Sequence, residues 1–138
     1  MKTKAKFQTI VFLFFLTLFL SCTNTEGECL ICNEDPIHIS KKSIQFDAEL
    51  NTITITTKGT TWKLIEISYN NSIIDLSGIN PQATTFKVEN PNFIFERKNS
   101  KEIFIEMSAN YTGNEKKLIA VLQDGDYFGQ IAVLQTID

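Results

Sequence analysis

The stretch that decides the fold is residues 103–135, IFIEMSANYTGNEKKLIAVLQDGDYFGQIAVLQ. Apolar side chains occupy every second position in three runs within it, at residues 103–107, 118–122 and 131–133. This alternation is typical of β-strands with one buried face. Turn-forming sequences separate the runs: an Asn-Tyr-Thr-Gly-Asn segment comes first and Asp124-Gly125 second. The stretch therefore predicts a meander of three antiparallel strands.

Two further runs upstream, residues 43–48 and 51–57, repeat this alternation. A third begins at Trp62, and its apolar phase slips at Ile65, so that Ile65, Ile67 and Tyr69 face the other way. An inserted bulge residue would cause such a slip.

The middle of the chain is less regular. Residues 84–88 and 93–95 predict two short strands, separated by a proline that cannot donate to a central ladder. Residues 70–81 contain Asn, Ser, Gly and Pro around a few apolar residues, which predicts a loop or a short edge strand.

About seven short strands with frequent turn signals predict an all-β fold, an immunoglobulin-like antiparallel β-sandwich over residues 43–138. The cysteine pair of immunoglobulin domains is absent, so stability must come from apolar burial. The large contributors expected are Phe46, Trp62, Phe86, Phe95 and Phe104.

The first residues have the layout of a signal peptide. Three lysines within the first six residues precede an apolar run at residues 10–20. The run is too short to span a bilayer, which needs roughly 20 apolar residues. We therefore expect residues 1–21 to be removed on export.

The end of that run, Ser21-Cys22, resembles the lipobox of bacterial lipoproteins, although Phe19 and Leu20 depart from the residues usual there. The resemblance implies cleavage before Cys22 and lipidation of Cys22, with several acyl chains forming a stable membrane anchor. Residues 22–42 would then form a flexible tether, and the chain would lie in the cell envelope, at the outer membrane on its periplasmic or surface side. The alternative is an ordinary secretory signal whose Cys22 remains a thiol or a disulfide partner.

The exported chain would be acidic. The 138 residues contain 13 Lys and Arg and 16 Asp and Glu, and the signal removes three lysines. The remaining 117 residues carry a net charge of −6 and are enough for one domain. An acidic chain without clustered basic residues argues against a nucleic-acid partner.

A single C-x-x-C motif, Cys29 and Cys32, follows the predicted anchor. Outside the cytoplasm these cysteines could form a short-loop disulfide, or they could remain two thiols with no special role. A redox motif would need a βαβ context, and a zinc site would need four ligands where only His38 could join the pair. No cofactor or metal is expected.

Residues 103–117, with the strands that follow and the final run ending at Gln135, resemble the BACON domain family. In that family an alternating strand leads to an Asn, a Gly-containing turn, a charged residue and another strand, and a final strand ends in Gln. Thr57-Lys58-Gly59-Thr60-Thr61-Trp62 is similar to the family's turn and tryptophan. The resemblance covers about residues 43–136; Lys116-Lys117 stands where arginine is usual. It implies an immunoglobulin-like fold on surface or secreted proteins of Bacteroidetes-type bacteria, with glycan or mucin binding or a spacer role.

The residues themselves favour binding over catalysis. A serine hydrolase would need a base, and the single histidine, His38, precedes the first predicted strand. A glycosidase would need two carboxylates across a cleft, whereas Asp124 and Asp126 share one predicted turn. The same pair lacks the additional oxygen ligands of a calcium site. We expect no enzymatic activity.

Sugar rings stack on exposed aromatic side chains, and Tyr69, Tyr111 and Tyr127 lie in or near predicted loops beside Asn and Asp. They are the candidate glycan contacts, although each could instead lie along a sheet edge. Two functions follow: a lipid-anchored module that binds or is associated with glycans, or a structural or accessory lipoprotein that contacts an envelope protein.

Overall fold

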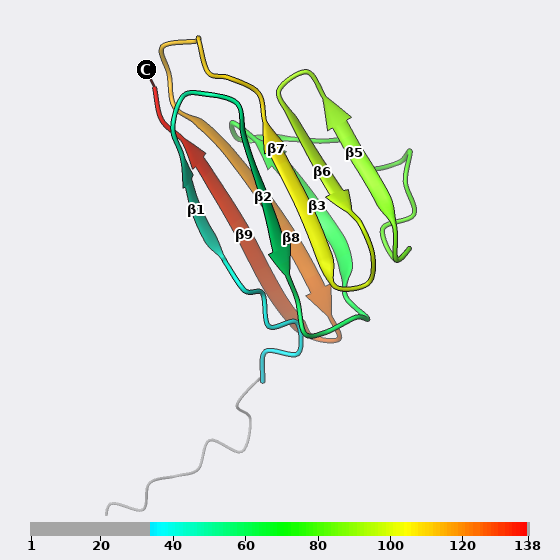
Figure 1. Ribbon diagram of the computed structural model, residues 1–138. Helices are drawn as coiled ribbons and strands as arrows, with labels where there is room; N and C mark the ends of the chain where they lie inside the picture. Colours follow the sequence, from blue (N-terminus) through cyan, green and yellow to red (C-terminus); the bar gives the residue numbers. More distant parts are fainter. Residues whose placement is uncertain (1–33, 138) are drawn as a thin grey trace, which may run out of the picture. The chain divides into compact units, whose positions relative to one another are not determined.

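The computed structural model describes residues 34–137 (Figure 1). The predicted signal peptide, the predicted lipidation site Cys22, and Cys29 and Cys32 lie outside these residues. All regular structure within residues 34–137 is β-strand. In this part of the chain, no helix has the length and apolar character that crossing a bilayer requires.

Most connections between consecutive strands are short, and the longest is residues 74–85, between the fourth and fifth strands. They are β1 (Ser43–Phe46), β2 (Asn51–Thr56), β3 (Lys63–Tyr69), β4 (Ser72–Ile73), β5 (Phe86–Asn90), β6 (Phe93–Arg97), β7 (Glu102–Met107), β8 (Lys116–Asp124) and β9 (Tyr127–Gln135).

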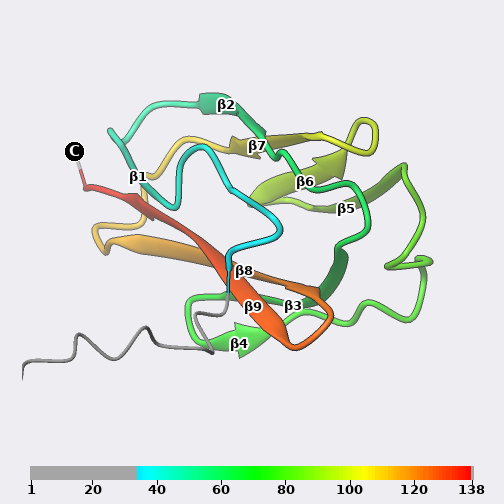
Figure 2. The same ribbon diagram turned by 90° about the horizontal axis from the view of Figure 1, so that it is seen from below.

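These strands form two sheets that face each other (Figure 2). The five-stranded sheet has the order β1-β9-β8-β3-β4, and the four-stranded sheet has the order β2-β7-β6-β5. Neighbouring strands are antiparallel except β1 and β9, which are parallel. The β9-β8-β3 and β2-β7-β6 groups correspond to the two sheets of an immunoglobulin domain, so the predicted immunoglobulin-like sandwich is confirmed.

The predicted meander is wrong in one respect. All three strands of residues 103–135 are present, and β8 and β9 form a hairpin. The first strand, β7, instead pairs with β2 and β6 in the opposite sheet. Residues 108–115 therefore cross between the sheets rather than closing a hairpin. Residues 34–137 also contain nine strands, two more than the roughly seven predicted.

The predicted bulge in β3 is confirmed. The register of β3 against β8 shifts between Leu64 and Glu66, which leaves Ile65 as the extra residue. Leu64 and Ile67 are both buried, whereas Ile65 is 40% exposed. The bulge thus keeps two core residues on the inner side and turns Ile65 outward, while Ile67, predicted on the same side as Ile65, faces the core.

The core lies between the sheets and contains the alternating apolar residues of β7, β8 and β9 as predicted. Of the five large contributors expected, Phe46, Trp62 and Phe95 are buried. Phe86 and Phe104 are half-buried. Phe104 points to the other side of β7 from its buried neighbours Ile103 and Ile105. Phe93, which the sequence did not single out, is 2% exposed.

Trp62, just before β3, packs against a buried arginine at the end of β6. The guanidinium carbon of Arg97 lies 3.5 Å from the centroid of the Trp62 ring, and Arg97 is 1% exposed. All five N–H groups of Arg97 donate to backbone carbonyls, those of Thr60, Trp62, Ala83, Asn99 and Ser100, at 2.8–3.3 Å. Arg97 therefore joins the start of β3, the segment before β5 and the β6–β7 turn.

Residues before β1 belong to the sandwich, which shortens the tether predicted for residues 22–42. Ile37 is fully buried and Ile39 is 7% exposed. The carbonyl of Ile37 accepts hydrogen bonds from the backbone N–H groups of Lys58 and Gly59. The packed domain thus begins near Asp35 instead of at residue 43.

Candidate interaction surface

The three tyrosines predicted as glycan contacts do not form one site. Tyr69, at the end of β3, pairs with Leu118 at the start of β8, whereas Tyr127 pairs with Asp124 at the other end of β8. Tyr69 is half-buried, with its ring centroid 5.6 Å from that of Phe93. Tyr111, in the β7–β8 connection, is 81% exposed. Of the three, Tyr111 alone presents most of its side chain to solvent.

Tyr127 takes part in a polar cluster where the chain enters the sandwich. The Lys42 ammonium donates to the Tyr127 hydroxyl at 3.2 Å and to the Asp35 carboxylate at 2.8 Å. Asp35 also accepts hydrogen bonds from the backbone N–H groups of Ile37 and His38. This cluster holds the entering segment against the start of β9.

The cluster changes the acidity of its members. Desolvation opposes ionisation of Asp35, but hydrogen bonds from the Lys42 side chain and the His38 backbone outweigh it and lower the pKa of Asp35 to about 2. The same hydrogen bonds, to Asp35 first and Tyr127 second, raise the pKa of Lys42. Both groups are therefore fully charged at neutral pH.

Asp124 and Asp126 form a turn, as the sequence indicates. Gly125 has a φ of 57°, which suits the first central position of a two-residue hairpin turn. The Asp124 carboxylate accepts a hydrogen bond from the Thr61 hydroxyl at 2.7 Å. Among residues 34–137, no three His, Cys, Asp or Glu side chains come close enough to hold a metal ion.

The outer face of the four-stranded sheet is mostly polar, with Ile94 and Phe104 as its half-buried apolar residues on β6 and β7. Ion pairs join Lys87 to Glu89 and Lys98 to Glu96, and the Lys98 ammonium lies 4.8 Å from the centroid of the Phe104 ring. The exposed side chains of β2 are threonines. A face of this kind is well solvated without a partner.

The outer face of the five-stranded sheet differs because β8 and β9 carry apolar residues on both of their sides. We call its outward apolar residues the apolar face. Its most exposed members are Phe128 (58%) and Ile65 (40%). Cross-strand pairing places Ile119 beside Ala132, and further half-exposed members flank this pair. The apolar face comprises Ile65, Ile119, Val121, Phe128, Ala132 and Leu134.

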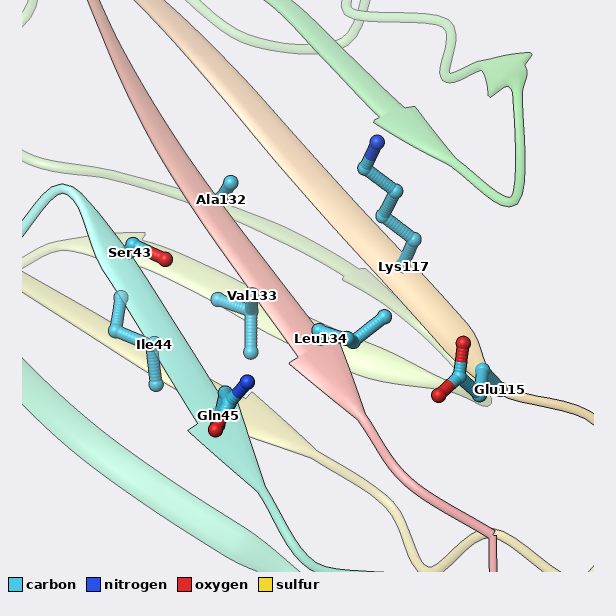
Figure 3. A pocket seen from close by; sticks show the side chains of 8 residues that line it. All are labelled: Ser43, Ile44, Gln45, Glu115, Lys117, Ala132, Val133 and Leu134. Carbon is cyan, nitrogen blue, oxygen red and sulfur yellow. The ribbon is translucent and has the colours of Figure 1, made fainter.

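A shallow hollow of about 400 Å³ lies over β1, β9 and β8 at one end of the apolar face (Figure 3). The apolar side chains of Ala132 and Leu134 lie beside the polar side chains of Ser43 and Gln45 from β1. Glu115, just before β8, and Lys117, in β8, add one charge of each sign. This lining combines apolar contact area with a few hydrogen-bonding groups, which suits binding; it offers no paired nucleophile and base.

Two apolar runs in the sequence indicate this surface. Residues 118–122 and 131–134 are continuous apolar runs, LIAVL and IAVL, in which the positions between the core residues are also apolar. A strand that faces water on one side usually alternates apolar with polar residues. Phe128 and Ile65 are harder to find, because the outward position of Ile65 depends on the bulge.

Comparisons with known proteins address the fold only. No protein-family model matches the chain, and no curated protein matches it. A protein from Bacteroides thetaiotaomicron solved by NMR is similar in structure, with a TM-score of 0.60 and 12% identity over 83% of this chain and 95% of that one. Titin domain M4 has a TM-score of 0.40 and 8% identity, and the match covers 71% of this chain and 86% of that one. Titin domain M7 has a TM-score of 0.40 and 9% identity, and the match covers 72% of this chain and 91% of that one.

Proposed function

We propose that the chain is a non-catalytic lipoprotein of the cell envelope, anchored through Cys22, that binds another envelope protein through the apolar face. The observation that carries the proposal is the difference between the two outer faces. One has ion pairs and threonines, whereas the other exposes Phe128 and Ile65 and has a hollow at the end where Ala132 and Leu134 lie. Exposed apolar surface of this kind marks interaction sites.

The contact would gain most of its free energy from burying Phe128 and its neighbours. Removing apolar surface from water is worth about 25 cal/mol per Å², and full burial of one phenylalanine about 1.5–3 kcal/mol. Glu115, Lys117 and Gln45 would form a polar rim that sets the orientation of the partner.

Site-specific photo-cross-linking tests this surface. A photoreactive amino acid at position 128 of the full chain, expressed in the cells that make it, should give one discrete adduct with another protein. The matched control places the same amino acid at Lys87, which is exposed on the outer face of the four-stranded sheet. Equal adducts from both positions, or none from position 128, would rule the proposal out.

The anchor is tested by cell fractionation. With Cys22 lipidated, the chain should sediment with membranes, and the Cys22→Ala chain should not, because a single lost anchor removes every acyl chain at once. A Cys22→Ala chain that still sediments with membranes would contradict the anchor.

Glycan binding is a second candidate function, supported by the exposure of Tyr111. The β7–β8 connection, which contains Tyr111, lies at the end of the sandwich opposite the start of the described residues (Figure 1). A tethered domain would hold that end away from the membrane. A Tyr111→Ala chain should then lose retention on mucin or polysaccharide beads, while Tyr69→Phe and Tyr127→Phe should keep it; unchanged retention of Tyr111→Ala would exclude this site.

A further inference from the structure

Strand β2 forms an edge of the four-stranded sheet and pairs only with β7. At its end, the Thr56 carbonyl accepts from the Ser40 N–H and the Thr56 N–H donates to the Ser40 hydroxyl, each at 2.9 Å. The polar backbone groups of Thr56 therefore point away from β7. In an antiparallel strand the backbone N–H and C=O groups of every second residue point to the same side. Those of Thr52 and Thr54 therefore also point away from β7. Neither residue has another backbone partner within residues 34–137.

The other edges of the sandwich are protected, whereas β2 is covered only at Thr56, by Ser40. The exposed edge strand β5 carries Lys87 and Glu89, while β4 is two residues long and β1 four. Charges and short length are the usual means of preventing edge pairing. The sequence of β2, NTITIT, has no charge and no proline, and its register against β7 is uninterrupted.

The chemistry of this edge fits a second copy of the same strand. An antiparallel copy can set Thr52 opposite Thr52 of the first copy, and a threonine pair is a favourable cross-strand pair. Asp47 and Glu49 precede the strand and Lys58 follows it. Lys58 makes no ion pair within the described residues. Antiparallel pairing brings the acidic end of one copy to the basic end of the other.

We propose that β2 pairs with β2 of a second copy about a two-fold axis near Thr52, which joins the two four-stranded sheets into one. An axis at Thr54 would bring the second copy against Ser40, which already occupies the edge at Thr56. With the axis at Thr52, Leu50 lies opposite Thr54 of the second copy. Leu50 is 58% exposed in the single chain, and this contact covers it.

The pairing is a small interface, because it consists of a few backbone hydrogen bonds and one apolar side chain from each copy. Interfaces of this size form weak dimers in free solution. Confinement to a membrane raises the effective concentration of the copies. The expected dimer population therefore rests on the proposed anchor. The paired surface itself is separate from the apolar face.

Cysteine cross-linking in whole cells tests the pairing whether or not the chain sediments with membranes. Thr52→Cys is introduced into the full chain with Cys29 and Cys32 replaced by serine, and the cells are treated with a short bis-maleimide. Thr52 of each copy would lie within the distance of one cross-strand pair, so a covalent dimer should form. The chain without Thr52→Cys measures any dimer through Cys22, and Lys87→Cys, on the exposed edge strand β5, measures random collision.

A second substitution, Thr54→Lys, should abolish the Thr52→Cys dimer, because it sets a charge on the edge of each copy. Thr52 and Thr54 are both exposed, so these changes leave the core intact. A dimer yield no higher than that of Lys87→Cys, or one that Thr54→Lys leaves unchanged, would overturn the inference. An adduct from position 128 with another protein would be unaffected by either result.

Discussion

At the scale of single residues, Arg97 is the largest departure from what the sequence suggested. It is a buried cation in an acidic chain, and its hydrogen bonds all go to backbone carbonyls. Burial lowers its pKa, but the guanidinium remains charged. Its hydrogen bonds tie the segments before β3 and β5 to the β6–β7 turn.

Substitution of Arg97 should therefore be costly. Arg97→Lys keeps the charge but cannot reach five carbonyls, and we expect a loss of about 1.5–3 kcal/mol in the free energy of unfolding. Lys98→Ala, at the exposed neighbouring position, should change it by less than about 0.5 kcal/mol. Urea unfolding followed by Trp62 fluorescence measures both, and equal effects would show that Arg97 is dispensable.

The Asp35 cluster predicts a pH dependence. The folded pKa of about 2 lies below the ordinary value of 3.8, so ionised Asp35 stabilises the fold above pH 3.8. That contribution is lost as the pH falls toward 2. The difference in urea midpoint between the parent chain and Asp35→Asn should be present at pH 6 and shrink between about pH 4 and pH 2. A difference that grows in acid would contradict the arrangement.

At the scale of elements, the sequence predicted strands better than it predicted their partners. Alternation located β7, β8 and β9, and the phase slip located the bulge at Ile65. The sheet to which β7 belongs depends on residues 108–115, and a connection of this length can close a hairpin or cross between sheets. What decides the matter is Asn110, whose side chain reaches Thr136 after β9, a contact between residues far apart in the sequence.

Asn110 should accordingly control this crossing. It is 1% exposed, and its side-chain amide donates to the carbonyls of Asn114 and Thr136 at 2.8 and 2.9 Å. Asn110→Ala leaves both carbonyls without this donor and should cost about 1–3 kcal/mol in thermal or urea unfolding. Asn114→Ala is the matched control, since Asn114 is exposed and its side chain donates only to Thr112. Equal losses would mean that Asn110 does not organise the connection.

At the scale of the whole molecule, the two outer faces and the two ends have different properties. The predicted sandwich is confirmed, whereas the three tyrosines that were each predicted as a candidate glycan contact are spread over its two ends. Sequence spacing could not show this, because the position of each tyrosine depends on which strands pair. The apolar face emerges only when β8, β9 and the β3 bulge are assembled into one sheet.

The central claim is that the apolar face binds a protein partner. The most direct measurement is the yield of the photo-cross-linked adduct from a probe at position 132, beside the hollow, with and without Phe128→Ser. Because Phe128 would be buried in the complex, its loss should reduce the adduct yield about tenfold or more at limiting partner concentration. The unfolding midpoint should stay unchanged, because Phe128 is exposed in the free chain. An adduct whose yield does not depend on Phe128, or a probe at 132 that gives none, would contradict the claim.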